Sequence, residues 1–137
     1  MTPPARRRPP ASLVLALLLV VVELGALAAL TGGMVVELVA GRTVDPLFTS
    51  ITAAVFIGLI VLLALAVRAL HQGRRWGRGP VITWQLLVLA IGISQAGALV
   101  WWLAALLIAI PVAVVVGTLV PPSVAWAHRT GPPRAVL

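Results

Sequence analysis

The chain has 137 residues, which is room for one domain, and 61% of them are hydrophobic while 9% are charged. A typical soluble domain carries roughly 25% charged residues, and a soluble fold of this size cannot bury so much apolar surface. The composition therefore excludes an ordinary globular domain and predicts a membrane protein. All 10 basic residues are arginines, and they lie between apolar runs rather than in a stripe with aromatic residues, which argues against nucleic-acid binding.

Groups that carry chemistry are scarce. The absence of cysteine excludes disulfides, thiolate metal sites and thiol nucleophiles. The two histidines, His71 and His128, lie in different loops, and the acidic residues are Glu23, Glu37 and Asp45. We therefore predict that the protein is not an enzyme and holds no metal or other cofactor.

The first apolar run covers residues 12–31 and is interrupted by Glu23. About 20 apolar residues are needed to cross a hydrocarbon core of about 30 Å, so this run predicts a spanning helix. Residues 34–40 either prolong the helix or lie in the outer interface. The arginines at 6–8 also allow a cleaved signal peptide, but an acidic residue inside the run and the length of the run disfavour this interpretation.

Three further spans follow. Asp45 is a candidate N-cap, and Pro46 suits the first position of a helix. Residues 80–120 are almost continuously apolar, which is too long for one span and suits two spans with a tight turn near Gly97. We predict spans at about 12–31, 46–70, 80–97 and 100–120, with tails at 1–11 and 121–137.

Arginine positions predict the orientation, because cytoplasmic segments of membrane proteins are enriched in basic residues. With four spans, nine arginines fall on one side and Arg42 falls on the other. We expect an all-α four-helix transmembrane bundle in the plasma (cytoplasmic) membrane, with both termini cytoplasmic. The nine are Arg6, Arg7, Arg8, Arg68, Arg74, Arg75, Arg78, Arg129 and Arg134.

The tryptophans agree with this topology, since their rings favour the level of the headgroups. Trp76, Trp84 and Trp126 fall at the predicted inner boundary, whereas Trp101 and Trp102 follow the outer turn. None of the five falls at a predicted mid-span position.

Small residues recur at every fourth position of the fourth span, which places them on one helical face. Such faces let transmembrane helices approach closely, so we expect a packing face or a self-association surface here. Pro111 lies inside the same span and is expected to kink it. The small residues are Ala105, Ala109, Ala113 and Gly117.

Glu23 is predicted near the bilayer midplane, where an ionised carboxylate costs about 2.5–3.5 kcal/mol or more. It is therefore expected to be protonated, hydrogen-bonded or beside a water-filled cavity. Candidate partners are Gln85 and Gln95, and also Ser50 and Thr52. The two glutamines are about 15 Å apart along a helix, so one carboxyl can reach only one of them. Gln85 is the preferred partner.

The inner loop carries Arg74, Arg75 and Arg78 beside a tryptophan. Arginines at this level attract anionic lipid headgroups by about 1 kcal/mol each. A topology signal with an aromatic anchor explains the same residues.

The sequence resembles a group of small, uncharacterised four-span membrane proteins of actinobacteria. The resemblance rests on Glu23, on RRWGRGP at 74–80, on TWQLL at 83–87 and on Gln95, and it covers about residues 12–122. It implies a location and a topology but no chemistry.

Three functions remain open, one of them a lipid-binding or membrane-stress protein that uses the inner arginines. The leading hypothesis is a non-enzymatic accessory or interaction protein of the plasma membrane. The alternative is a small proton-coupled transporter that uses Glu23, since small multidrug-resistance exporters also have four spans and a glutamate in the first. Their weak arginine bias and aromatic cation site are not matched by this sequence.

Overall fold

The computed structural model describes residues 9–127, and every regular element in that range is helical. Four helices are long and apolar enough to cross a membrane, which confirms the predicted all-α fold with four spans. The terminal arginines and His128 lie outside the described residues. The elements are α1 (Ala11–Val39), α2 (Pro46–His71), the 3₁₀ turn η1 (Arg75–Gly77), α3 (Arg78–Ser94), α4 (Trp101–Leu119) and α5 (Pro121–Ala127).

The first helix is longer than its apolar run. α1 continues through Gly32 and Gly33 to Val39, so residues 34–40 prolong the helix. In an apolar environment the backbone must satisfy its own hydrogen bonds, and this favours a continuous helix even across two glycines. The sequence left open whether this segment prolongs the helix or lies in the outer interface, and in the structure it is helical.

The ends of α2 are fixed by its sequence. Asp45 caps the N-terminus, because its side chain accepts a 2.9 Å hydrogen bond from the Phe48 backbone N–H, and Pro46 occupies the first turn as expected. At the C-terminus Gly73 adopts φ +78°, and the Arg74 N–H donates to the Ala69 carbonyl. This glycine-dependent turn satisfies the last carbonyls of the helix and folds the chain back on itself.

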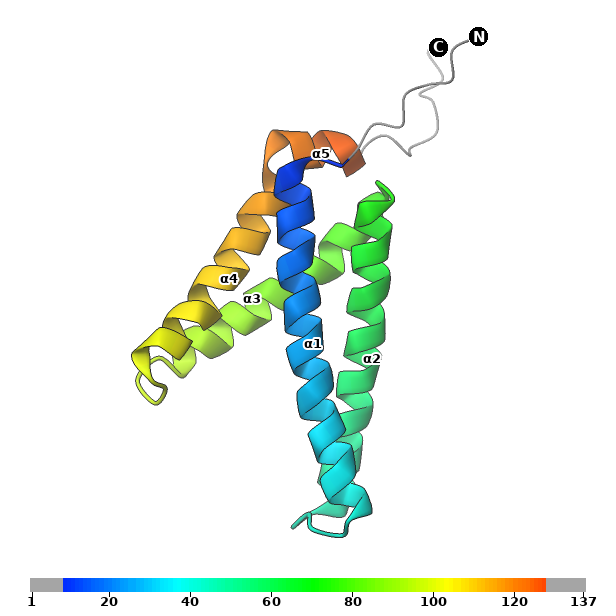
Figure 1. Ribbon diagram of the computed structural model, residues 1–137, viewed down its shortest axis with the longest axis vertical. Helices are drawn as coiled ribbons and strands as arrows, with labels where there is room; N and C mark the ends of the chain where they lie inside the picture. Colours follow the sequence, from blue (N-terminus) through cyan, green and yellow to red (C-terminus); the bar gives the residue numbers. More distant parts are fainter. Residues whose placement is uncertain (1–8, 128–137) are drawn as a thin grey trace.

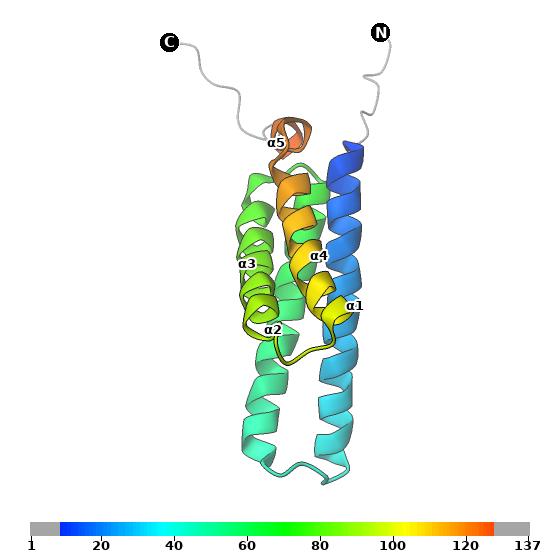
Figure 2. The ribbon, with the colours of Figure 1, turned by 90° about the vertical axis from the view of Figure 1, so that its left-hand side faces the viewer.

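The four long helices form two hairpins, α1–α2 and α3–α4. α1 packs on α2 and α4, and α3 also packs on α2 and α4, so α1 and α3 lie across the diagonal of the bundle. The hairpins diverge toward the end opposite α5, and α1–α2 extends further (Figures 1 and 2). At about 1.5 Å per residue α1 and α2 are about 44 and 39 Å long, against about 26 and 29 Å for α3 and α4.

Charge separates the two ends of the bundle. The start of α1, the end of α2, η1 and α5 share one end (Figure 1). The opposite end of α1–α2 lies beyond the tip of the shorter hairpin, as Figure 2 shows. Glu37, Arg42 and Asp45 belong to this end of α1–α2. Both ends of the described chain therefore lie on the same side. The arginines at the α5 end are Arg68, Arg74, Arg75 and Arg78.

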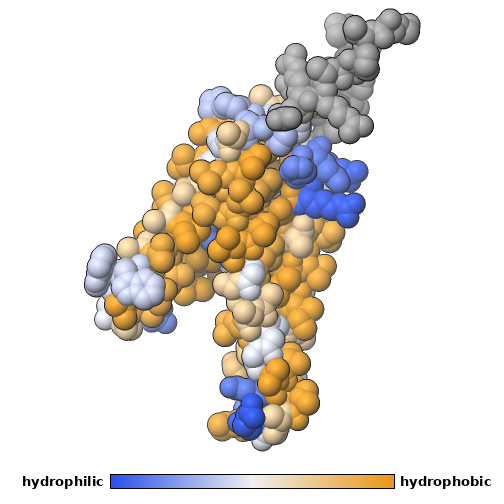
Figure 3. All heavy atoms as spheres, in the orientation of Figure 1, coloured by the Kyte–Doolittle hydropathy of each residue, from blue (hydrophilic) through white to orange (hydrophobic). Residues whose placement is uncertain are grey.

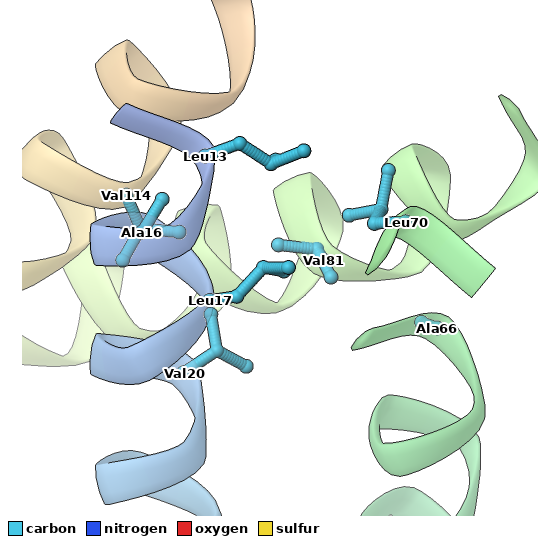
Figure 4. Close-up of a cluster of buried hydrophobic side chains, with 8 residues drawn as sticks. All are labelled: Leu13, Ala16, Leu17, Val20, Ala66, Leu70, Val81 and Val114. Atoms are coloured by element: carbon cyan, nitrogen blue, oxygen red, sulfur yellow. The ribbon is translucent and has the colours of Figure 1, made fainter. Parts of the chain in front are cut away.

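The buried core lies near the α5 end, where all four long helices meet (Figure 4). Its largest part comes from one face of α1, whose buried residues recur at helical spacing. Away from this core the surface is largely apolar, and it is hollowed between the two diverging hairpins (Figure 3). The core residues are Leu13, Ala16, Leu17, Val20, Ala66, Leu70, Val81 and Val114.

At one position, the small-residue stripe of α4 packs against another helix of the same chain. A Cβ on Gly117 would lie 2.9 Å from the Ala16 Cβ of α1, so this glycine permits a close helix crossing. The prediction of a packing face within one copy of the chain is wrong for three residues of the stripe, because Ala105, Ala109 and Ala113 are exposed. The face of α4 that is buried consists of Ala104, Pro111, Val114 and Thr118.

The segment after residue 120 was predicted as a tail, but it begins with α5, which packs across the bundle end. Ser123 is buried, and its Oγ donates to the Gly117 carbonyl at 2.7 Å. Because that bond uses its only proton, the 3.2 Å contact with Ser12 has the Ser12 hydroxyl as donor. Arg78 Nη2 donates to the Ser123 carbonyl at 3.0 Å. α5 thus links α1, α3 and α4.

Candidate functional site

Glu23 lies twelve residues into α1, about 18 Å along the helix axis from its start. Its Oε2 accepts two hydrogen bonds from α3, one from Gln85 Nε2 at 2.7 Å and one from Trp84 Nε1 at 3.0 Å. The pairing with Gln85 is the one predicted. Since α1 and α3 are diagonal neighbours, these long side chains cross the centre of the bundle.

Two oxygen atoms of this cluster have no partner among residues 9–127. Glu23 Oε1 and Gln85 Oε1 are both buried and accept no hydrogen bond. Gln85 itself has 0% of its surface exposed. A buried acceptor without a donor is costly, so each such atom calls for an explanation, such as a bound water, ion or ligand.

An open pocket of about 360 Å³ adjoins the carboxyl. Glu23 and Trp84 supply its polar groups, and the remaining lining residues are apolar. The residues that line the pocket come from α1, α3 and α4, and the ribbons of α1 and of the α3–α4 hairpin diverge in Figure 1. Its apolar lining consists of Val22, Ala26, Leu27, Leu30, Val88, Leu103, Leu106, Leu107, Ile110 and Pro111.

Pro111 contributes to this wall from inside α4, which continues through it from Trp101 to Leu119. Proline has no N–H, so the Leu107 carbonyl lacks the donor that residue 111 normally provides. Gly92 of α3 packs against that carbonyl, because a Cβ at this position would lie 2.9 Å from the Leu107 oxygen. The two helices therefore meet closely beside the pocket.

The other candidate partners of Glu23 are occupied elsewhere or distant. Ser50 and Thr52 donate to carbonyls of their own helix, those of Leu47 and Phe48. Gln95 is exposed at the C-cap of α3, ten residues beyond Gln85. The structure thus brings together Glu23 and Gln85 but not Gln95.

The three inner-loop arginines differ in their surroundings. Arg78 is tied to the Ser123 carbonyl of α5, whereas Arg74 and Arg75 are exposed. Among residues 9–127 no group of three or more His, Cys, Asp or Glu side chains is placed to hold a metal ion.

Trp84 is the residue whose role the sequence analysis missed. It was assigned to the inner boundary, but its indole lies in the pocket and donates to Glu23. The available signal was its position beside Gln85, because neighbouring residues of a helix can both reach toward one partner on a crossing helix.

No family model, curated protein or solved structure matches this chain. The resemblance to four-span proteins of actinobacteria therefore stays a prediction. Function has to be argued from the geometry of the site.

The chemistry available at this site is that of one carboxyl group. Both donors, Trp84 and Gln85, bond the same oxygen and can do so whether the carboxyl is ionised or neutral. The second oxygen is buried and is left to take a proton, and an ionised carboxyl attracts a cation to the pocket that Glu23 lines. An apolar pocket with one such acceptor and an indole suits a ligand with an apolar body and a cationic group.

Proposed function

We propose that this protein is a non-enzymatic membrane transporter that binds a lipophilic cation at Glu23 and exchanges it for a proton. The observation that carries the proposal is that Glu23 lines an apolar pocket of about 360 Å³ and has one buried carboxyl oxygen, Oε1, without a hydrogen-bond partner among residues 9–127. An ionised carboxylate in this position attracts a cation, and a protonated one does not. Proton and cation therefore compete for the same carboxyl group.

Trp84 removes one objection to this function. The sequence seemed to lack an aromatic residue at mid-span, which a cation site needs. Trp84 lines the pocket, and its indole N–H donates to Glu23, so an aromatic side chain is present beside the carboxyl.

The test is uptake of the cationic dye ethidium into inside-acidic proteoliposomes that contain the full chain. We expect uptake with the unaltered protein and none with Glu23→Gln, because the amide keeps the size and the acceptor oxygen but cannot ionise. The expected loss is at least about tenfold, which corresponds to about 1.4 kcal/mol. Glu37→Gln is the matched control, since Glu37 is exposed near the end of the same helix.

Uptake that survives Glu23→Gln, or that Glu37→Gln abolishes equally, contradicts the proposal. Thermal unfolding of each purified variant in detergent shows whether it is folded before transport is compared.

A second candidate is an accessory protein that associates through α4. The exposed alanines at 105, 109 and 113 favour it, because small residues on an exposed face let another transmembrane helix approach. Glu23 takes no part in that function, so the transport experiment separates the two.

We also propose that the protein lies in the cytoplasmic membrane with its α5 end facing the cytoplasm. The support is the arginine bias, with Arg68, Arg74, Arg75 and Arg78 at that end and Arg42 at the other.

Single cysteines test this orientation cleanly, because the chain contains none of its own. Val44→Cys, in the α1–α2 loop, is expected to react with a membrane-impermeant maleimide on intact cells. His71→Cys is expected to react only after permeabilisation. Both positions are exposed, so the opposite pattern would reverse the orientation.

A further inference from the structure

We propose that a pocket at the C-terminal end of α2 binds the phosphate headgroup of an anionic phospholipid. The pocket has a volume of about 280 Å³ and is separate from the one at Glu23. Its lining residues come from the last turns of α2 and from the loop that follows, and they are Leu65, Arg68, Ala69, Gln72, Arg74 and Trp76.

The two arginines of the pocket carry uncompensated charge. Arg68 and Arg74 are exposed, and within residues 9–127 neither guanidinium makes a hydrogen bond or an ion pair. The acidic side chains are remote, since Glu37 and Asp45 lie at the opposite end and Glu23 bonds α3. Guanidinium groups bind phosphate oxygens in a paired geometry, so this site suits a phosphate.

These arginines are not needed to cap α2. Basic residues often bond the last carbonyls of a helix, which is the simplest explanation for Arg68 in the last turn. Here the loop backbone fills that role, because the N–H groups of Gln72, Gly73 and Arg74 donate to the carbonyls of Arg68, Leu70 and Ala69. The side chains of Arg68 and Arg74 are left for a ligand.

The loop is held in the position that forms the pocket. Gly73 turns the chain at φ +78°, and Gly77 packs so closely on α2 that a Cβ would lie 2.4 Å from the Ala66 carbonyl oxygen. Trp76 lies between these fixed points, with 49% of its surface exposed.

The shape of the site favours a lipid over a free anion. Leu65, Arg68, Ala69 and Gln72 follow one face of α2 at helical spacing, so the pocket runs from charged to apolar along the helix. Leu65 is 49% exposed on the bilayer side of the arginines, where acyl chains lie. An amphipathic tryptophan at the charged end suits the membrane interface.

The experiment titrates the purified full chain in detergent with phosphatidylglycerol and with phosphatidylcholine and counts bound lipid by native mass spectrometry. We expect preferential binding of phosphatidylglycerol. Each arginine removed is expected to weaken it about fivefold, so Arg68→Gln with Arg74→Gln should weaken it about twenty-five-fold. Arg42→Gln with Arg75→Gln removes the same charge outside the pocket and is expected to weaken binding by no more than about fivefold, because only Arg75 lies at this level of the membrane.

Three results overturn the proposal: equal binding of the two lipids, equal losses in the two double variants, or full displacement of phosphatidylglycerol by an equal concentration of inorganic phosphate. The last result makes the site one for free anions. If the pocket double variant does not fold, the single substitutions Arg68→Gln and Arg74→Gln give the same comparison, with about fivefold expected for each.

Discussion

Gly77→Ala is expected to lower the free energy of unfolding by about 3 kcal/mol, the upper end of the range for overpacked sites. The new Cβ would lie 2.4 Å from the Ala66 carbonyl oxygen and 3.0 Å from the Leu70 Cγ. The first atom belongs to the backbone of α2, which cannot rotate away as a side chain can. Relief requires η1 to move off α2, which opens the core near Leu70 and Val81.

Gly58→Ala is the matched control for this substitution. Gly58 lies within α2, and a Cβ there meets nothing within 4 Å. Alanine is the better helix former, so this variant should be neutral or slightly more stable. Denaturation of the two purified variants in mixed micelles measures the difference. Equal stability would show that the contact between η1 and α2 is not tight.

Movement of η1 should also weaken the lipid site, because Trp76 lies immediately before Gly77. The same titration with phosphatidylglycerol applies to the folded fraction of Gly77→Ala. This links the stability of the loop to the pocket that it forms.

Hydropathy predicts the spans well because the bilayer imposes one strong constraint: every backbone group in a span must be bonded internally, so a long apolar run is a helix. The same constraint explains the one boundary that was left open. Gly32 and Gly33 look like a helix end by the rules of soluble proteins, yet α1 passes through both. Asp45 and Pro46 carried an explicit signal for the start of α2, and that signal was correct.

Contacts between helices were harder to predict, because periodicity identifies a face but not its partner. The stripe on α4 has the spacing of a packing face, but the tilt of the α3–α4 hairpin leaves Ala105, Ala109 and Ala113 exposed. Only Gly117, near the shared core, meets α1. The tilt of a hairpin depends on the whole assembly and cannot be seen in one helix.

Only one of the two hydrogen-bond partners of Glu23 was predicted from the sequence. A glutamate in an apolar span requires a partner, and few polar residues were available, which is how Gln85 was identified. Trp84 was assigned by a general preference of tryptophan for interfaces, and that preference gave way to a specific hydrogen bond with Glu23. The average preference of tryptophan for the interface is a weak guide where a buried carboxyl oxygen needs a hydrogen-bond donor.

The second large effect is expected at the Glu23 cluster. Glu23→Leu removes the acceptor of two hydrogen bonds and leaves Trp84 Nε1 and Gln85 Nε2 without a partner in an apolar setting. Hydrogen bonds between transmembrane helices contribute about 0.6–1.7 kcal/mol each, so we expect a loss of about 1–3 kcal/mol in the free energy of unfolding. Gln85→Leu should cost less, because Glu23 keeps the bond from Trp84.

The decisive comparison is the double variant Glu23→Leu with Gln85→Leu. Gln85 is fully buried, and with Glu23 gone both ends of its amide lack partners, so replacing it should restore part of the lost stability. The double variant is therefore expected to be more stable than Glu23→Leu alone. Gln95→Leu, an exposed glutamine at the end of the same helix, should change stability by no more than about 0.5 kcal/mol. If the double variant loses the full sum of the two single losses, the two side chains act independently, and the diagonal bond between α1 and α3 does not hold the hairpins together.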